Sequence, residues 1–261
     1  MLLLSLRLRI DGSNIFLTGA SSGIGAALAA ELTRRGARVA GVSRRPASHV
    51  AVSITADLTV PLDRARAASE ALSALGRIDI LINNAGAGAY SPSWQTPMED
   101  MRRMFELNLF AAVDFAQRFV PAMRERRAGQ VVNVASIASK VTLPWFTLYS
   151  ASKAALESFS RGLRMELQND GIGVTLVCPG YVKTAFQASV LGGKPPEKLA
   201  HNRRFAATAE AVARAVADGM EADARTVLTP RVGWALVAAA RLAPDFADAR
   251  LRAMMETAGD G

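Results

Sequence analysis

Ser136, Tyr149 and Lys153 have the residue types and spacing to transfer a proton to a carbonyl. Tyr149 and Lys153 are four residues apart in a helical pattern, so we expect both side chains on one helix face. A positive charge favours phenolate, so we expect Lys153 to lower the pKa of Tyr149 from about 10. Ser136 ends the predicted strand 130–136, where open α/β sheets bind ligands. The same spacing occurs on ordinary amphipathic surface helices, so this pattern alone decides nothing.

A glycine-rich turn follows the first predicted strand, residues 14–18. A helix is expected after it, from about residue 24 to 35, ending before Gly36. Glycines between a strand and a helix let the backbone approach a pyrophosphate, and the helix N-terminus supplies amide donors. The spacing is GxxxGxG rather than the common GxGxxG, and a tight turn that merely needs glycine is the alternative. The segment reads Gly19-Ala20-Ser21-Ser22-Gly23-Ile24-Gly25.

The residues after the second predicted strand, 37–43, favour NADP(H) over NAD(H). Sites for NAD place an acidic residue about twenty positions after the glycines. Here Ser43 stands eighteen positions after Gly25 (43 − 25), and Arg44 and Arg45 follow it. No acid repels a 2′-phosphate there, and a guanidinium can bind one.

The rest of the chain alternates predicted strands and helices. The connection from Arg45 to the next strand, 50–54, is too short for a crossover helix, so we expect an open adenosine side. Further strands are expected at 78–82, 173–178 and 226–229, the last at a sheet edge. Further helices are expected at about 62–75, 97–127, 146–169 and 208–222.

A single domain is expected to span residues 1–261. Glycine and proline pairs in the segment 185–205 suit a mobile lid over the site. Residues from about 230 to 256 are expected to form a helical tail with a proline break.

Composition limits the class of protein. Lysine and arginine exceed aspartate and glutamate by 8 (31 − 23), but the basic residues are scattered and no nucleic-acid motif is present, so we expect no nucleic-acid binding. The single cysteine, Cys178, lies in an apolar run and excludes an internal disulfide. With only two histidines, no metal site is expected. A reducing, cytoplasmic location fits this usage.

These motifs together resemble the short-chain dehydrogenase/reductase family over about residues 12–230. The matching segments are Thr18 to Gly25, Asn83-Asn84-Ala85-Gly86, Asn108, Ser136, Tyr149-Ser150-Ala151-Ser152-Lys153 and Pro179-Gly180. The resemblance implies an α/β fold with a doubly wound, mostly parallel seven-stranded Rossmann sheet flanked by helices. It implies an NAD(P)-dependent oxidoreductase that interconverts a ketone or aldehyde and an alcohol, assembled as a homodimer or homotetramer.

The resemblance also assigns roles. It implies Tyr149 as general acid/base, Ser136 orienting the carbonyl, Lys153 binding the nicotinamide ribose, and Asn108 holding a water that relays protons to Lys153. Ser22 stands where many NADP-using relatives have a basic residue, which leaves Arg44 and Arg45 to select the cofactor. The implied cofactor contacts are Gly19, Ser21, Ser22, Gly23, Ile24, Gly25, Ser43, Arg44, Arg45, Asp57, Leu58, Asn83, Asn84, Ala85, Gly86, Tyr149, Lys153, Pro179, Gly180, Val182 and Thr184.

Apolar residues near the motifs favour a hydrophobic carbonyl or alcohol as substrate, although they could equally be ordinary packing. The candidates are Ala138, Trp145, Phe146, Tyr181 and Phe186, with residues 138–143 and 87–94 nearby. Two alternatives remain: an NADP-binding sensor or scaffold with vestigial catalysis, and a membrane or lipid contact through the apolar segment 232–242. That segment is too short to span a membrane, and a helix that covers the core or contacts another subunit is favoured.

Overall fold

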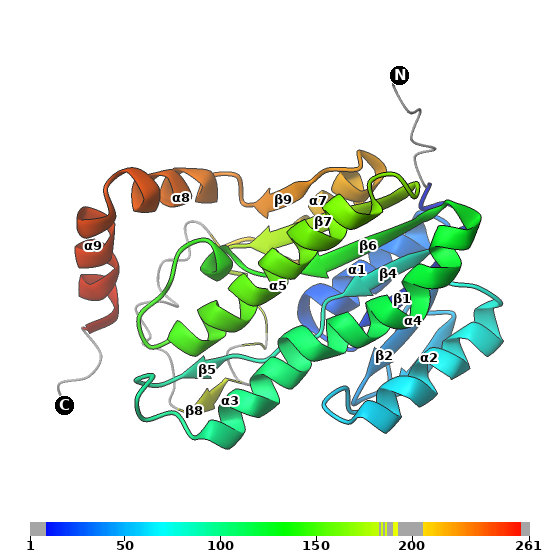
Figure 1. The fold of residues 1–261 in the computed structure, drawn as a ribbon, viewed down its shortest axis with the longest axis horizontal. Coiled ribbons are helices and arrows are strands. Elements are labelled where there is room, and N and C mark those ends of the chain that lie inside the picture. The colour runs from blue at the N-terminus through cyan, green and yellow to red at the C-terminus, as the bar shows by residue number, and fades with distance from the viewer. Residues whose placement is uncertain (1–8, 183, 185, 187–189, 193–205, 257–261) are drawn as a thin grey trace.

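The computed structural model describes residues 9–182, 184, 186, 190–192 and 206–256. Its central sheet has seven parallel strands, and their arrangement can be followed in Figure 1. Their spatial order is β3-β2-β1-β4-β6-β7-β9, and every neighbouring pair is parallel. The predicted doubly wound sheet, including its edge strand β9, is therefore confirmed. The strands are β1 Asn14–Thr18, β2 Arg38–Ser43, β3 Val52–Thr55, β4 Ile80–Asn83, β6 Gly129–Val134, β7 Ile172–Pro179 and β9 Thr226–Thr229.

Helices cover both faces of this sheet. Side chains alternate along β1: Phe16 packs with the layer of α2, α4 and α5, while Ile15 and Leu17 pack with the layer of α1 and α7. All three are fully buried, as expected of a parallel sheet between two helical layers. The helices are α1 Gly23–Arg34, α2 Pro61–Leu75, α3 Met98–Phe105, α4 Ala111–Arg126, α5 Thr147–Leu167 and α7 Ala209–Glu221.

The strand order reverses between β1 and β4, which lie side by side with their next strands on opposite sides. Ligands of open α/β sheets bind at such a reversal, beyond the carboxyl ends of the strands. The fold therefore places the Gly19 turn, after β1, and the Asn84 loop, after β4, at one crevice.

Two connections differ from regular crossovers. Residues 44–51, between β2 and β3, contain no helix, as predicted, and the two strands pair directly. The helix predicted over 97–127 is divided by a π-helical turn, Glu106–Phe110, between α3 and α4. Such turns are frequent at functional sites, and Asn108 lies within this one.

The C-terminal tail forms α8 Gly233–Leu242 and α9 Pro244–Glu256, so the predicted helices and the break at Pro244 are confirmed. Of the predicted lid, 185–205, only Phe186 and residues 190–192 are described; the rest lies outside the described residues. Leu191–Gly192 (β8) pairs with Ala89–Tyr90 (β5). Among the helices described, none combines the length and apolar character needed to cross a bilayer.

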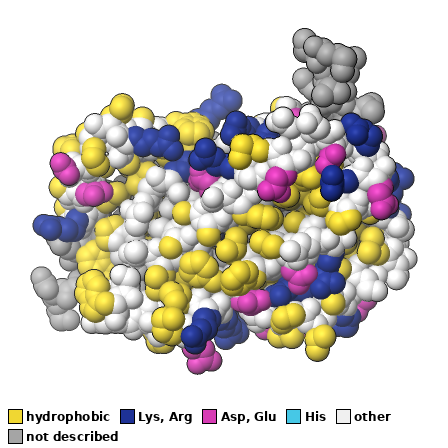
Figure 2. All heavy atoms as spheres, in the orientation of Figure 1, with side chains coloured by type: hydrophobic (Ala, Val, Ile, Leu, Met, Phe, Trp, Pro, Cys, Tyr) yellow, Lys and Arg dark blue, Asp and Glu magenta, His cyan; other side chains and the backbone are white. Residues whose placement is uncertain are grey.

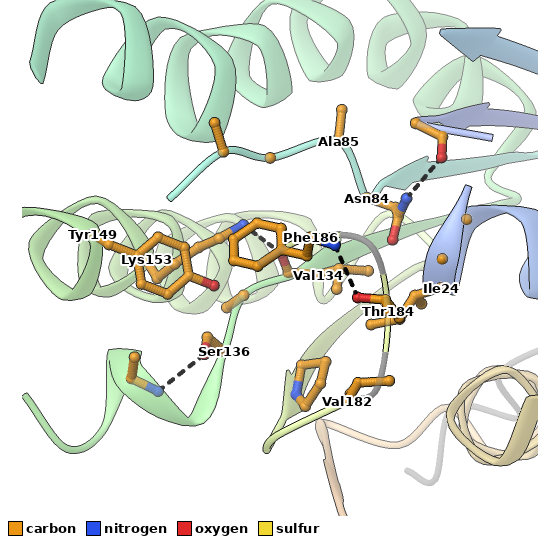
Figure 3. Close-up of a pocket in the computed structure, with 18 of the residues that line it drawn as sticks. Ile24, Asn84, Ala85, Val134, Ser136, Tyr149, Lys153, Val182, Thr184 and Phe186 are labelled. Atoms are coloured by element: carbon orange, nitrogen blue, oxygen red, sulfur yellow. Dashed lines mark hydrogen bonds between the residues drawn. The ribbon is translucent and has the colours of Figure 1, made fainter. Parts of the chain in front are cut away.

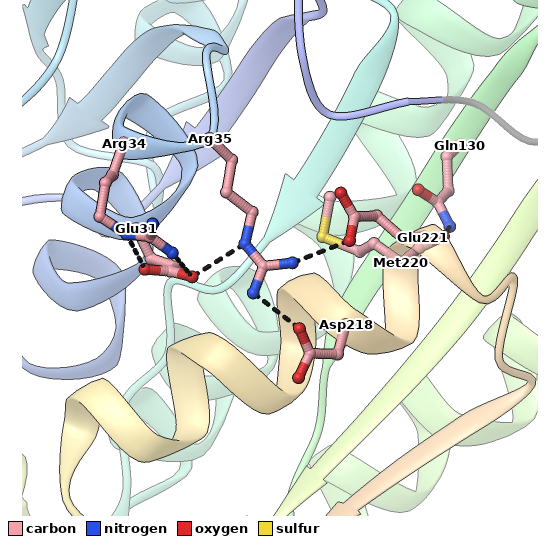
Figure 4. Close-up of polar contacts among 7 residues, drawn as sticks. All are labelled: Glu31, Arg34, Arg35, Gln130, Asp218, Met220 and Glu221. Atoms are coloured by element: carbon pink, nitrogen blue, oxygen red, sulfur yellow. Dashed lines mark hydrogen bonds and ion pairs between the residues drawn. The ribbon is translucent and has the colours of Figure 1, made fainter.

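Charged side chains of both signs are interspersed on the face in Figure 2. Some of these charged side chains link helices to one another. The Arg35 guanidinium joins α1 to α7 through ion pairs with Asp218 at 2.6 Å and Glu221 at 2.9 Å (Figure 4). It also bonds Glu31 at 2.8 Å. Hydrogen bonds from Arg34 and then Arg35 hold the pKa of Glu31 near 2, against the effect of its burial. Part of the basic excess thus fixes helix packing.

Candidate active site

A cavity of about 860 Å³ lies beyond the carboxyl ends of the central strands. Except for Asn83, every residue that the sequence indicated for the cofactor lines it, and so do Ser136, Tyr149 and Lys153. One cavity therefore joins the glycine turn to the proton-transfer residues.

The glycine turn requires glycine for steric reasons. Gly19 has φ +72°, a conformation that side-chain-bearing residues rarely adopt. A Cβ built on Gly25 would lie 2.0 Å from the carbonyl oxygen of Gly19. Ser22 precedes α1 in an extended conformation, and its side chain caps no amide. The first amides of α1 are therefore open to an anion, and the cradle fits a pyrophosphate.

Asn84 fixes the neighbouring loop rather than only facing the cavity. Its Nδ2 donates to the carbonyl oxygen of Thr18 at 2.9 Å, and Thr18 Oγ1 accepts from the amides of Asn84 and Ala85 at 2.9 and 3.0 Å. Asn83 instead donates to Asn133 Oδ1 at 2.8 Å inside the sheet. The geometry gives Asn83 a packing position rather than the expected place near the cofactor.

Ser136 and Tyr149 face each other in the cavity (Figure 3). Ser136 follows β6 and caps the short turn Ile137–Ser139, with its Oγ accepting from the amide of Ala138 at 3.1 Å. The Ser136 side chain is near enough to the Tyr149 phenol to lower its pKa. The rings of Phe146 and Phe186 flank the phenol, with centroids 6.1 and 5.8 Å from that of Tyr149.

The electrostatics of Tyr149 differ from the sequence-based expectation. Burial raises the pKa of Tyr149 to about 12, and the nearby Ser136 side chain opposes this only in part. Burial lowers the pKa of Lys153 to about 8, and its Nζ donates to the carbonyl oxygen of Val134 at 2.9 Å. The expectation that Lys153 lowers the pKa of Tyr149 was wrong for the protein alone, because burial dominates and, among the described residues, the only opposing effect comes from Ser136. Tyr149 as a whole is only half-buried, so its exposure to solvent moderates this effect.

Asn108 is buried and has protein partners on both sides. Its amide pairs with both backbone groups of Ala87, accepting at 2.8 Å and donating at 2.9 Å. Its Nδ2 also donates to Ser152 Oγ at 2.9 Å, and Ser152 Oγ donates to the carbonyl oxygen of Tyr149 at 2.7 Å. Asn108 therefore ties the loop after β4 to the helix that bears Tyr149.

The adenosine side of the cavity is basic. Arg44 and Arg45 line it, and so does Arg103 of α3, which sequence reasoning missed. Partial burial acts to raise the pKa of Asp57, but hydrogen bonds from Thr59 and the charges of Arg103 and Arg44 lower it below its usual value. The sequence alone does not show which of the adjacent residues Arg102 and Arg103 faces the cavity, because this depends on how α3 is rotated about its axis.

The opposite end of the cavity is apolar and includes the C-terminal helices. Of the predicted substrate residues, Ala138, Phe146, Tyr181 and Phe186 line it, whereas Trp145 does not line the cavity formed by the described residues. Trp145 adopts φ +60°, and its carbonyl oxygen accepts from the amide of Ser91 at 3.0 Å. Lining residues that the sequence did not indicate include Met104, Leu107, Val232, Leu236 and Leu251.

Sequence comparisons agree with this geometry. The family model "short chain dehydrogenase" matches residues 13–194. The first curated relatives are 32–39% identical, and the matches span 61–66% of their length. The 1-deoxy-11-beta-hydroxypentalenate dehydrogenase of Streptomyces exfoliatus is 39% identical over 64% of this chain and 66% of that protein. The uncharacterized oxidoreductase YbbO of Escherichia coli K12 is 33% identical over 90% of this chain and 92% of its own length.

Solved structures share the fold. A short-chain dehydrogenase from Burkholderia cenocepacia in complex with NADP is 30% identical, with a TM-score of 0.78 over 94% of this chain and 99% of that one. A short-chain dehydrogenase/reductase from Burkholderia phymatum in complex with NAD has a TM-score of 0.80 over 97% of this chain and 99% of its own, at 24% identity. The second likeness shows the fold alone.

Proposed function

The chain belongs to the short-chain dehydrogenase family of oxidoreductases, and from this premise we propose an NADP(H)-dependent enzyme that interconverts a hydrophobic ketone or aldehyde and its alcohol. The main support is the placement of Ser136, Tyr149 and Lys153 in the same cavity as the Gly19–Gly25 turn. Proton transfer and nucleotide binding thereby share one cavity.

In the proposed reaction, the nicotinamide supplies or accepts the hydride when it is bound. Ser136 Oγ donates a hydrogen bond to the substrate carbonyl oxygen, and the Tyr149 phenol gives that oxygen its proton. Lys153 keeps its bond to Val134 and presents its remaining N–H groups to the ribose hydroxyls. The raised pKa keeps the phenol protonated before reduction, which suits a proton donor.

NADP(H) is proposed because Arg44 and Arg45 line the adenosine side and no acid follows β2. Ser43 has an internal role there, since its Oγ donates to the carbonyl oxygen of Arg45 at 2.7 Å. That bond holds the start of the arginine loop against the strand end. A 2′-phosphate would then meet guanidinium donors and no carboxylate of β2.

A hydrophobic substrate is proposed because the end of the cavity around Tyr149 is lined by aliphatic and aromatic side chains from several elements. They include Leu143, Phe146, Phe186, Leu236 and Leu251. Burial of apolar substrate surface against such walls contributes about 25 cal/mol per Å². A small polar carbonyl would gain little of this.

A test would follow NADPH and NADH absorbance against hydrophobic and polar carbonyls, with Tyr149→Phe as the control. We expect turnover with NADPH, a preference for hydrophobic carbonyls, and a loss in kcat of at least about 100-fold in the variant. NADPH binding should persist in that variant. Turnover of small polar carbonyls alone, or a preference for NADH, would contradict the proposal.

We further propose a cytoplasmic homodimer or homotetramer. Phe110 and Met165 are 51% and 65% exposed on the π-helical turn and α5, and burial between subunits would remove that apolar surface from water. Sedimentation equilibrium would test the assembly, and a monomer at micromolar concentration would contradict it.

A further inference from the structure

Arg64 of α2 is a buried charge that the proposed reaction does not use. It is only 5% exposed, yet its guanidinium contacts three different segments. Its Nε donates to Asp114 Oδ2 at 2.6 Å, and its Nη1 donates to Glu106 Oε1 at 2.7 Å and to the carbonyl oxygen of Leu58 at 2.9 Å. A buried guanidinium costs hydration, so its contacts have to be well made.

The contact with Leu58 reaches the adenosine side of the cavity. In the loop after β3, the amides of Asp57, Thr59 and Val60 all donate within the loop or to Asp63. For the Leu58 amide, no acceptor is found among the described residues, and Leu58 lines the cavity. Arg64 holds the carbonyl oxygen of this residue, so it helps to fix how the loop presents Leu58 to a ligand.

The contact with Glu106 reaches the catalytic side. Glu106 begins the π-helical turn, whose next residues are Leu107, which lines the cavity, and Asn108, which ties Ala87 to Ser152. Asp114 lies two turns further on, in α4. Without the guanidinium, the carboxylates of Glu106 and Asp114 would repel each other and strain the turn.

We propose that Arg64 is a positioning residue that holds the Leu58 loop and the Asn108 turn in one arrangement, so that nucleotide binding and proton transfer are aligned. This inference rests on the proposed function for the identity of the nucleotide. The part that concerns how Arg64 holds the Leu58 loop and the Asn108 turn does not depend on that function. Arg64 acts through Leu58 and Glu106 and contacts neither substrate nor cofactor.

Binding of NADPH and of adenosine 2′,5′-bisphosphate to Arg64→Met and to Arg118→Met would test the first contact. Arg118 is a matched control because it also pairs with Asp114, at 2.5 Å, but its side chain is 36% exposed. Among the described residues it forms no hydrogen bond or ion pair with Leu58 or Glu106. We expect Kd for both ligands to rise on the order of tenfold in Arg64→Met and to stay within about twofold in Arg118→Met. Equal Kd values in wild type and a folded Arg64→Met would overturn the proposal.

Amide hydrogen exchange would test the second contact without any ligand. Exchange over residues 57–60 and 106–110 should accelerate in Arg64→Met, and only the latter segment should accelerate in Glu106→Gln. Arg64→Lys should restore part of the protection, and it serves with Glu106→Gln if Arg64→Met does not fold. Unchanged exchange in these variants would overturn the inference.

The two proposals fail in different ways. A wild-type protein that binds neither NADPH nor adenosine 2′,5′-bisphosphate contradicts the proposed function, while the exchange result still decides the role of Arg64. Tight NADPH binding in wild type with no difference in the Arg64 variants contradicts the inference alone.

Discussion

Asn108 and Lys153 meet across Gly86: a Cβ built at Gly86 would lie 3.1 Å from both Oδ1 of Asn108 and Nζ of Lys153. The loop after β4 therefore passes between the residue that ties the loop to α5 and the buried ammonium. Because Gly86 also lines the cavity, a side chain there would disturb both at once.

Gly86→Ala should lower kcat about tenfold while the protein remains folded. The added methyl group must displace the Lys153 ammonium or the Asn108 amide, and no positive φ is recorded at Gly86 to add backbone strain. Steady-state kinetics with NADPH and thermal unfolding would measure this. Gly162→Ala is the control, since a Cβ there meets only Glu166 Oε1 at 3.9 Å. Equal kcat in the Gly86 variant and wild type would show that the loop has more room than the structure gives it.

The depressed pKa of Lys153 predicts a specific dependence of stability on pH. The pKa of Lys153 is about 8 in the folded protein and 10.5 in its unperturbed state. Between these values the unfolded chain binds more protons, so wild-type stability gains a contribution as pH rises. Below pH 8 the buried charge costs up to about 3 kcal/mol.

Lys153→Met removes this contribution, so the stability of the variant relative to wild type should fall from about pH 7 to about pH 9.5. Urea unfolding of both proteins at the two pH values measures how this stability difference changes with pH. The lost hydrogen bond to Val134 lowers the stability of the variant equally at both pH values, so it cancels from the comparison. A stability difference that does not change with pH would show that Lys153 is well hydrated in the folded protein.

The raised pKa of Tyr149 predicts a dependence of stability on pH with the opposite sign to that of Lys153. The pKa of Tyr149 is raised from 10 to about 12, so its stabilising contribution is complete below pH 10 and is lost as pH rises through 12. In the protein without cofactor, Tyr149→Phe should remove the most alkaline step of the phenolate absorbance titration. If the variant instead lost a step near pH 7, the original expectation that the Lys153 charge lowers the pKa of Tyr149 would be correct.

The sequence predicted the sheet, the glycine turn and the common helix of Tyr149 and Lys153 because each depends on local pattern. Strand, glycine turn and helix follow one another within residues 14–36, and Tyr149 and Lys153 share one helix. The buried state of Lys153 could not be predicted, since it depends on β6 supplying the Val134 carbonyl from nineteen residues away. Trp145 was assigned to the substrate from its aromatic ring and its place near the motifs, and it does not line the cavity formed by the described residues. Arg64 was passed over because its partners lie six, 42 and 50 residues distant.

The apolar end of the cavity predicts how the tail affects the substrate. Leu236 of α8 lines the cavity, whereas Leu242 on the same helix is 86% exposed and does not. Leu236→Asp should raise KM for a hydrophobic carbonyl at least about tenfold, because the charge would be desolvated by the substrate. Leu242→Asp is the control and should leave KM unchanged, and Kd for NADPH should be unaltered in both. An equal effect of the two substitutions would mean that α8 acts through stability and not through the cavity.

The arginines after β2 predict the cofactor preference. Arg44→Ala should weaken NADPH binding by about tenfold or more, since a charge-assisted contact with the 2′-phosphate is lost, and should change NADH binding little. The serine before it offers the complementary change, because Ser43→Asp places a carboxylate where NAD sites have one and should favour NADH. Fluorescence titration of both cofactors measures the ratio of the two Kd values. If Arg44→Ala weakens the binding of NADPH and NADH equally, Arg44 binds a part of the nucleotide that both cofactors share. The preference for NADPH must then come from Arg45 or Arg103, the other basic side chains that line this end of the cavity.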